Sequence, residues 1–181
     1  DTLGRKITYL RLSVTDLCDL RCIYCMPEQG VPKRAHGEMC SLEELRDMAA
    51  AAVSLGVRKI RVTGGEPLVR RGVASLCRML REIPGLDELC ITTNGMLLPE
   101  LAQPLRDVGV DRLNVSLDTL RPERYRAITR VGELSSVLRG LDAAEAAGFT
   151  NTKLNCVLMG GVNDDEIADF VRLTLERPLS V

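Results

Sequence analysis

Apolar and polar residues follow two repeating patterns along this chain. Short runs rich in β-branched residues are separated by longer stretches in which apolar residues recur every three or four positions. The first pattern is typical of strands and the second of amphipathic helices. Strands are predicted at 7–15, 57–63, 88–93, 112–117 and 152–159, with a sixth beginning at 179, and helices at 42–55, 73–80, 99–108, 122–128, 134–147 and 167–175.

Local signals refine some of these helices. Ser41 and Glu44 have the spacing of a capping box at the start of the first helix. The polar run 163–166 is predicted to cap the last helix, and Pro104 is predicted to kink the helix that contains it.

Strands that alternate with helices indicate βαβ units and a parallel sheet. The chain has 181 residues, enough for a sizeable core, and no linker or low-complexity stretch divides it. Residues 1–181 are therefore predicted to form one α/β domain. In such folds ligands bind at the carboxyl ends of the strands.

Distinctive stretches follow four successive predicted strands. A cysteine-rich segment follows the first, Gly64-Gly65-Glu66-Pro67 the second, Thr93-Asn94-Gly95 the third and Ser116-Leu117-Asp118 the fourth. Each could merely turn or cap the chain. Their coincidence at one edge of the predicted sheet favours a shared ligand site there.

Three of the seven cysteines, Cys18, Cys22 and Cys25, have the spacing C-x3-C-x2-C. Thiolates are soft ligands that select zinc, copper(I) or iron–sulfur clusters. A closed structural site needs four protein ligands, yet the next cysteine is Cys40. The spacing therefore indicates a four-iron cluster with one iron open to a substrate or cofactor. Zinc held by these cysteines and the single histidine, His36, is the alternative.

Charge and composition limit the classes of partner. The net charge is −1 and there are five aromatic residues, three Tyr and two Phe, so the sequence favours neither nucleic acid nor an anionic membrane as a partner. No apolar run is long enough to span a membrane. An odd, clustered set of cysteines favours a reducing compartment. A cytoplasmic location is expected, with a mitochondrial one as the alternative because the chain does not begin with Met.

Arg11, Lys59, Arg61 and Lys153 lie on three of the predicted strands. Charged strand residues are usually solvated, but inward positions in a barrel covered by helices must be paired. Arg11 shares a face with Ser13, and Arg61 shares a face with Thr63. A basic cluster inside the barrel would suit a polyphosphate.

The cysteine spacing, with the aromatic Tyr24 directly before the last cysteine, resembles the signature of the radical S-adenosylmethionine (SAM) enzymes. This resemblance implies a partial (β/α)6 TIM-type barrel, here reaching only the start of strand six. It implies a 4Fe-4S cluster held by Cys18, Cys22 and Cys25. SAM would chelate the open iron, and the reduced cluster would cleave it to a 5′-deoxyadenosyl radical.

Several stretches together resemble, more closely, the GTP cyclase family of molybdenum-cofactor biosynthesis. They are 5–6, 9–13, 15–18, 24–27, 61–68, 92–95, 114–118 and 153–155. That family rearranges GTP to the cyclised precursor of cyclic pyranopterin monophosphate. The resemblance implies that SAM is contacted by Tyr24, Gly65 and Ser116. It implies that GTP is contacted by Arg11, Arg61, Thr92 and Lys153.

One departure from the cyclase family concerns a second 4Fe-4S cluster, which that family holds with three C-terminal cysteines. No such triplet follows Cys25. The chain is therefore expected to be an incomplete radical SAM core that is inactive on GTP alone. The implied partners are GTP, an electron donor such as a flavodoxin or ferredoxin, the cyclic pyranopterin monophosphate synthase that acts next, and a second copy in a homodimer.

Two other interpretations stay open. One is a radical SAM enzyme that modifies a peptide or RNA. The other is a non-catalytic zinc-binding module.

Overall fold

The structure, a computed structural model, describes residues 4–32 and 39–181. Its strands are β1 (Tyr9–Ser13), β2 (Lys59–Thr63), β3 (Glu88–Thr93), β4 (Arg112–Ser116), β5 (Thr152–Asn155) and β6 (Leu179–Ser180). Its α-helices are α1 (Leu42–Ser54), α2 (Val73–Arg81), α3 (Leu98–Asp107), α4 (Pro122–Thr129), α5 (Leu134–Ala146) and α6 (Ile167–Glu176). Short 3-10 turns lie at Pro67–Val69 and Asp164–Glu166.

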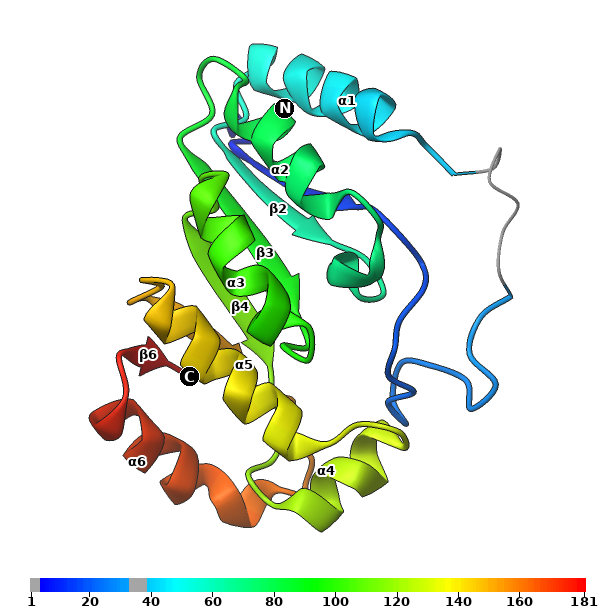
Figure 1. The fold of residues 1–181 in the computed structure, drawn as a ribbon, viewed down its shortest axis with the longest axis vertical. Helices are drawn as coiled ribbons and strands as arrows, with labels where there is room; N and C mark the ends of the chain where they lie inside the picture. Colours follow the sequence, from blue (N-terminus) through cyan, green and yellow to red (C-terminus); the bar gives the residue numbers. More distant parts are fainter. Residues whose placement is uncertain (1–3, 33–38) are drawn as a thin grey trace.

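The strands form one parallel sheet in the order β1-β2-β3-β4-β5-β6, so every strand pairs with its neighbour in the sequence. The crossover helices lie against one face of this sheet, while α4 lies near the end where the strands finish (Figure 1). This architecture confirms the predicted α/β fold and its partial TIM-type barrel.

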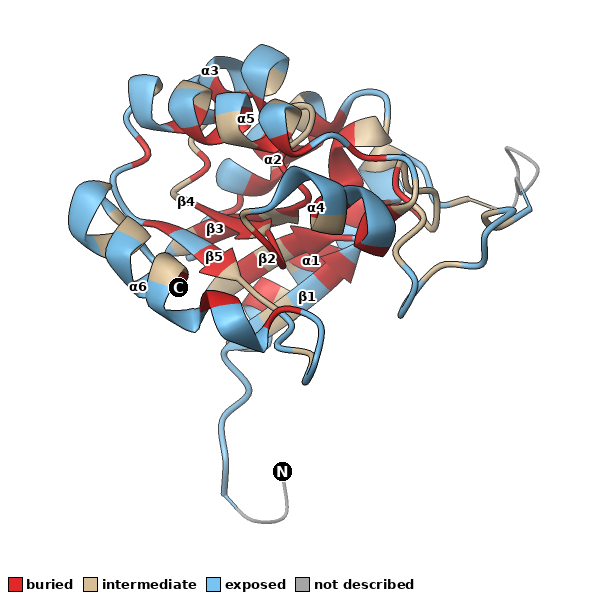
Figure 2. Ribbon diagram, turned by 90° about the horizontal axis from the view of Figure 1, so that it is seen from below, coloured by how far each residue is buried: buried red, intermediate tan, exposed pale blue. Residues whose placement is uncertain are grey.

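The two faces of the sheet differ sharply in chemistry because side chains alternate along each strand. On the helix-covered face, eight strand residues are apolar and at most 8 % exposed: Leu12, Ile60, Val62, Leu89, Ile91, Leu113, Val115 and Leu154. This face and the inward sides of the helices form the core, which Figure 2 shows as buried ribbon. The opposite face, the inner face of the partial barrel, carries mostly polar and charged residues.

Local capping is partly as predicted. The capping box of α1 is confirmed, since Ser41 Oγ accepts from Glu44 N at 3.1 Å and Ser41 N donates to Glu44 Oε2 at 2.7 Å. The run 163–166 does precede α6, with Glu166 at its N-cap position, but neither Asn163 nor Glu166 makes a side-chain capping hydrogen bond. The Asn163 side chain instead donates to the carbonyls of Asp118 and Val157, at 2.7 and 2.9 Å.

Four strands, β1, β2, β4 and β5, are shorter than predicted. β1 begins at Tyr9 rather than at Ile7, whose side chain is exposed. β5 ends at Asn155 because the Val157 N–H turns away from strand pairing and donates to Asp118 Oδ1 at 2.8 Å.

Pro104 does not interrupt α3, which continues to Asp107.

Within residues 4–32 and 39–181, no helix combines the length and the apolar character needed to cross a lipid bilayer.

A glycine in α5 allows that helix to pack closely against the turn between β3 and α3. A Cβ at Gly140 would lie 2.2 Å from the carbonyl oxygen of Gly95, in the turn after β3. Alanine is more favourable than glycine inside a helix, so helix propensity favours alanine at position 140 while tertiary packing opposes it. A backbone oxygen cannot move aside as a flexible side chain can, so packing decides the outcome.

We therefore expect Gly140→Ala to lower the free energy of unfolding by about 2 kcal/mol, as overpacked core substitutions do. Urea denaturation of the purified chain measures this change. The matched control is Gly160→Ala, because a Cβ there meets nothing within 4 Å. Unchanged or increased stability of Gly140→Ala would contradict this account of the packing.

Candidate functional site

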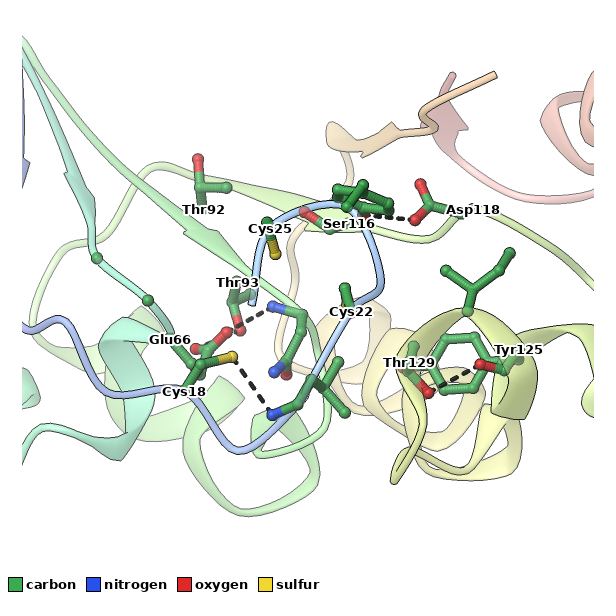
Figure 3. A pocket seen from close by; sticks show the side chains of 16 residues that line it. Cys18, Cys22, Cys25, Glu66, Thr92, Thr93, Ser116, Asp118, Tyr125 and Thr129 are labelled. Carbon is green, nitrogen blue, oxygen red and sulfur yellow. Dashed lines mark hydrogen bonds between the residues drawn. The ribbon is translucent and has the colours of Figure 1, made fainter. Parts of the chain in front are cut away.

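A cavity of about 200 Å³ lies at the carboxyl ends of β2, β3 and β4. The loop after β1, which we call the cysteine loop (residues 14–32), contributes Cys18, Leu20, Cys22, Tyr24 and Cys25 to its lining. Figure 3 shows the three cysteines on this one loop, with side chains from the strand ends and from α4 around it. The predicted gathering of motifs at one edge of the sheet is thus confirmed.

Most of the predicted site residues line this cavity. They are Cys18, Cys22, Cys25, Tyr24, Gly65, Thr92 and Ser116. Arg11, Arg61 and Lys153 lie instead on the inner face of the sheet. His36, the fourth ligand in the zinc alternative, lies outside the described residues.

The three cysteines are free thiols in one cavity. Among the described residues, no three His, Cys, Asp or Glu side chains already stand in a metal-binding arrangement. Burial, followed by nearby negative charge, raises the pKa of Cys18 to about 11 and that of Cys22 to about 12. The cavity therefore favours neutral thiols until a cation is present, which fits ligands whose thiolate form requires a metal.

The cysteine loop continues the hydrogen bonding of β1 beside the turn after β2. Gly65 N donates to Thr15 O at 2.7 Å, and Glu66 N donates to Leu17 O at 2.8 Å. A Cβ on Gly64 would lie 2.5 Å from Thr15 O, and one on Gly65 would lie 2.3 Å from Leu17 O. The paired glycines therefore allow the cysteine loop itself to approach the turn after β2 closely.

Glu66 joins the ends of β2 and β3. Its buried carboxylate accepts hydrogen bonds from Leu68 N (3.0 Å), Thr93 Oγ1 (2.8 Å) and Asn94 N (2.6 Å). Burial outweighs these donors and raises the pKa of Glu66 to about 7. No cation is paired with this carboxylate among the described residues, although it lines the cavity.

Glu166 repeats this arrangement one step along the sheet. Its buried carboxylate accepts from Thr119 Oγ1 and Leu120 N, both at 2.6 Å, just as Glu66 accepts from Thr93 and Asn94. Here Arg124 also donates to the carboxylate. Burial alone would raise the pKa of Glu166, but these hydrogen bonds and the Arg124 charge lower it.

Asp118 ties the cysteine loop to the ends of β4 and β5. Its Oδ2 accepts from the Tyr24 hydroxyl at 2.6 Å, and its Oδ1 accepts from Val157 N. Burial, followed by the bond to Asp118, raises the pKa of Tyr24, so its hydroxyl stays a donor. Tyr24 thus has a second contact besides the SAM contact implied by resemblance.

Arginine side chains fix the cysteine loop through its carbonyl groups. Arg21 Nη1 donates to the carbonyls of Cys18 and Leu20, at 2.6 and 2.8 Å. Arg70 reaches Val14 O and Cys40 O, at 3.3 and 2.6 Å. Arg130 reaches Arg21 O and Met26 O, at 2.8 and 3.1 Å. Contacts therefore begin before Cys18 and continue beyond Cys25.

Sequence reasoning missed several residues of this site. Asn94 is not among the predicted site residues, yet it lines the cavity, and its Nδ2 donates to Asp19 Oδ1 at 2.6 Å. Asp118 and Tyr125 also line it. The available signal was a polar residue directly after a predicted strand, which located the edge of the sheet but not the partner of each side chain.

The inner face is basic beside this cavity. Arg11 and Arg61 are register partners on β1 and β2, and Lys153 pairs with Asn114 across β4 and β5. Arg11, Arg61 and Lys153 have no ion-pair partner within the described residues, and Arg61 Nε is buried without a hydrogen bond. Lys59 and Arg112 instead share one carboxylate, Glu88, at 2.6 and 2.7 Å.

Comparison with curated proteins finds relatives named GTP 3′,8-cyclase. The protein from Geobacter sulfurreducens is 59 % identical over 181 residues, and that from Peptoclostridium acidaminophilum is 55 % identical. In both cases the match covers 100 % of this chain and 56 % of the relative. The chain therefore spans little more than half the length of these relatives.

Solved structures share the fold at low sequence identity. Streptococcus suis SuiB bound to S-adenosylmethionine matches with a TM-score of 0.75 and 19 % identity, over 93 % of this chain and 36 % of that one. TYW1 with a lysine–pyruvate adduct matches with a TM-score of 0.68 and 21 % identity, over 96 % and 65 %. The model of the radical SAM superfamily matches residues 12–174. Since this match covers most of the sheet and the whole cysteine-lined cavity, the chain belongs to the radical SAM superfamily.

Proposed function

We propose that this chain is the radical-generating part of a GTP 3′,8-cyclase, which converts GTP to the cyclised precursor of cyclic pyranopterin monophosphate. Membership of the radical SAM superfamily implies a 4Fe-4S cluster and SAM as cofactors. The observation that carries the more specific proposal is the position of unpaired cations, Arg11, Arg61 and Lys153, beside a cavity lined by three cysteines. The relatives named GTP 3′,8-cyclase support it.

In this proposal Cys18, Cys22 and Cys25 hold the cluster. Tyr24, Gly65 and Ser116, which line the same cavity, hold SAM. The Glu66 carboxylate has no cationic partner there and is suited to accept from the amino group of SAM. When bound, the reduced cluster and SAM supply the carbon radical that removes the ribose 3′ hydrogen of GTP.

The inner face is suited to the triphosphate. Like charges on neighbouring strands repel one another, so Arg11 opposite Arg61 is unfavourable until an anion lies between or above them. Lys153 on β5 extends this positive field. Thr92 on β3 is the register partner of Asn114 on β4, which in turn pairs with Lys153. Arginine recognises phosphate with several charge-assisted hydrogen bonds, which makes a polyphosphate the best match.

The contribution of the protein to the reaction is positional. With the triphosphate on the inner face and SAM at the strand ends, the ribose of GTP would lie between them. Fixing the ribose 3′ carbon close to guanine C8 favours ring closure over side reactions. The walls of the cavity, including Leu20, Tyr125 and Ile128, limit access of water to this region.

Further partners are included in this proposal. A second 4Fe-4S cluster, an electron donor such as a flavodoxin or ferredoxin, and the synthase that acts next are parts of this proposal. So is the expectation that these 181 residues alone leave GTP unchanged.

Anaerobic reconstitution with iron and sulfide tests the metal site. We expect about four iron atoms per wild-type chain, with matching acid-labile sulfide, because a 4Fe-4S cluster has that composition. Cys22→Ser should lose most of this iron. Cys40→Ser, which changes an exposed cysteine that does not line the cavity, should retain it. Bound zinc without sulfide in the wild type would support the zinc-binding alternative instead.

Calorimetric titration with GTP tests the basic face separately. We expect Arg61→Gln to weaken GTP binding by roughly 10- to 100-fold, the effect of losing charge-assisted hydrogen bonds. Arg78→Gln alters an exposed arginine on the outer helix α2 and is the matched control. Guanosine should bind much more weakly than GTP. Equal affinity of wild type and Arg61→Gln for GTP would contradict the assignment and favour a peptide- or RNA-modifying enzyme.

A further inference from the structure

Arg130 has an unusual backbone conformation at the point where α4 ends. Its φ is +65°, and it is the one non-glycine residue with positive φ in the described part of the chain. Helices often end with a glycine in the left-handed helical region, but Arg130 has a ψ of −38° and lies outside that region, where a residue with a side chain is strained. An arginine at this position opposes the local preference, so its side chain must contribute something that glycine cannot.

The helix itself does not need the arginine side chain. The hydrogen bond that closes the last turn runs from Arg130 N to Arg126 O at 2.8 Å, and any residue except proline could make it. The guanidinium group instead contacts the cysteine loop. Its Nη1 donates to Arg21 O at 2.8 Å and to Met26 O at 3.1 Å. Those two carbonyls lie on either side of Cys22 and Cys25 in the sequence.

The same segment is attached to α4 through its backbone. Arg21 N donates to Thr129 O at 3.1 Å, and Ile23 N donates to Ile128 O at 2.9 Å. Arg130 therefore completes a set of contacts that holds residues 21–26 against the end of the helix. Within the described residues its guanidinium makes no ion pair, so no carboxylate competes for these contacts.

We infer that Arg130 is a positioning residue for the cysteine loop. Its guanidinium holds the segment that carries Cys22 and Cys25 before any cluster binds, and so sets the arrangement of their thiols. The backbone strain at Arg130 is retained because the side chain makes this attachment. The inference rests on the proposed ligation of the cluster by Cys18, Cys22 and Cys25.

The first experiment measures alkylation rates in the metal-free chain, peptide by peptide, with iodoacetamide and mass spectrometry. Arg130→Gly removes the guanidinium and suits the positive φ, so the variant should fold. We expect Cys22 to react about tenfold faster, as the loss of roughly one net charge-assisted hydrogen bond implies. Buried Cys77 should keep its slow rate. An unchanged rate at Cys22, or a parallel rise at Cys77, would overturn the inference.

Two further variants separate the attachment from a general effect on α4. Arg130→Lys keeps a cationic donor and should recover most of the protection of Cys22. Arg126→Gln changes an arginine of the same helix that contacts Val131 O and Glu133 rather than the cysteine loop, and should behave as wild type. Deprotection by Arg126→Gln, or no recovery with Arg130→Lys, would contradict the inference.

The reconstituted chain provides a spectroscopic readout. We expect the dithionite-reduced cluster to give one EPR signal in the wild type and in Arg126→Gln, and a weaker, heterogeneous signal in Arg130→Gly. An identical signal in Arg130→Gly would count against the inference. A wild-type chain that binds no cluster would contradict the proposed function instead, while the alkylation rates would still test the role of Arg130.

Discussion

The buried Glu66 carboxylate is the interaction on which the arrangement of this site depends. Parallel strands end with backbone N–H groups that the sheet no longer pairs, and a buried N–H must find an acceptor. Glu66 supplies one to Asn94 after β3, while its own N–H bonds the cysteine loop at Leu17. Glu166 supplies the equivalent acceptor to the turn after β4, where it accepts from Thr119 Oγ1 and Leu120 N. Only Glu66 lacks a cationic partner, and only Glu66 lines the cavity. Glu166 thus has a structural role alone, whereas Glu66 has a structural role and a proposed ligand contact.

The alternation of side chains along the strands separates stability from function. Residues such as Ile91 and Val115 bury the helix-covered face, whereas their neighbours Thr92 and Ser116 point to the opposite side. The cations of the inner face lie outside the apolar core, so they do not disturb its packing. They can therefore stay without an ion-pair partner and bind an anion. The cysteine loop then lies across the strand ends, where side chains from several strands converge. A fold with this division can hold a cluster and a charged nucleotide without placing either in the apolar core.

Most of the elements could be predicted because periodicity reports burial, and burial is what distinguishes the faces of these strands and helices. β5, which is shorter than predicted, shows the limit of that signal, since an apolar Val157 suited a strand but its N–H donates to Asp118. The cavity could be located because unusual residues followed successive strands. The contacts that join its different elements could not be predicted, because they link residues far apart in the sequence. Glu66 to Thr93 and Arg130 to Met26 are examples.

Reductive cleavage of SAM tests the central claim most directly, namely that the cavity at the strand ends generates the radical. The reconstituted 181-residue chain is incubated with SAM and dithionite without oxygen, and 5′-deoxyadenosine is quantified. The account predicts that 5′-deoxyadenosine forms with the wild-type chain and not with Cys22→Ser. A chain that carries a full 4Fe-4S cluster yet forms no 5′-deoxyadenosine, or forms it equally well without Cys22, would contradict the account.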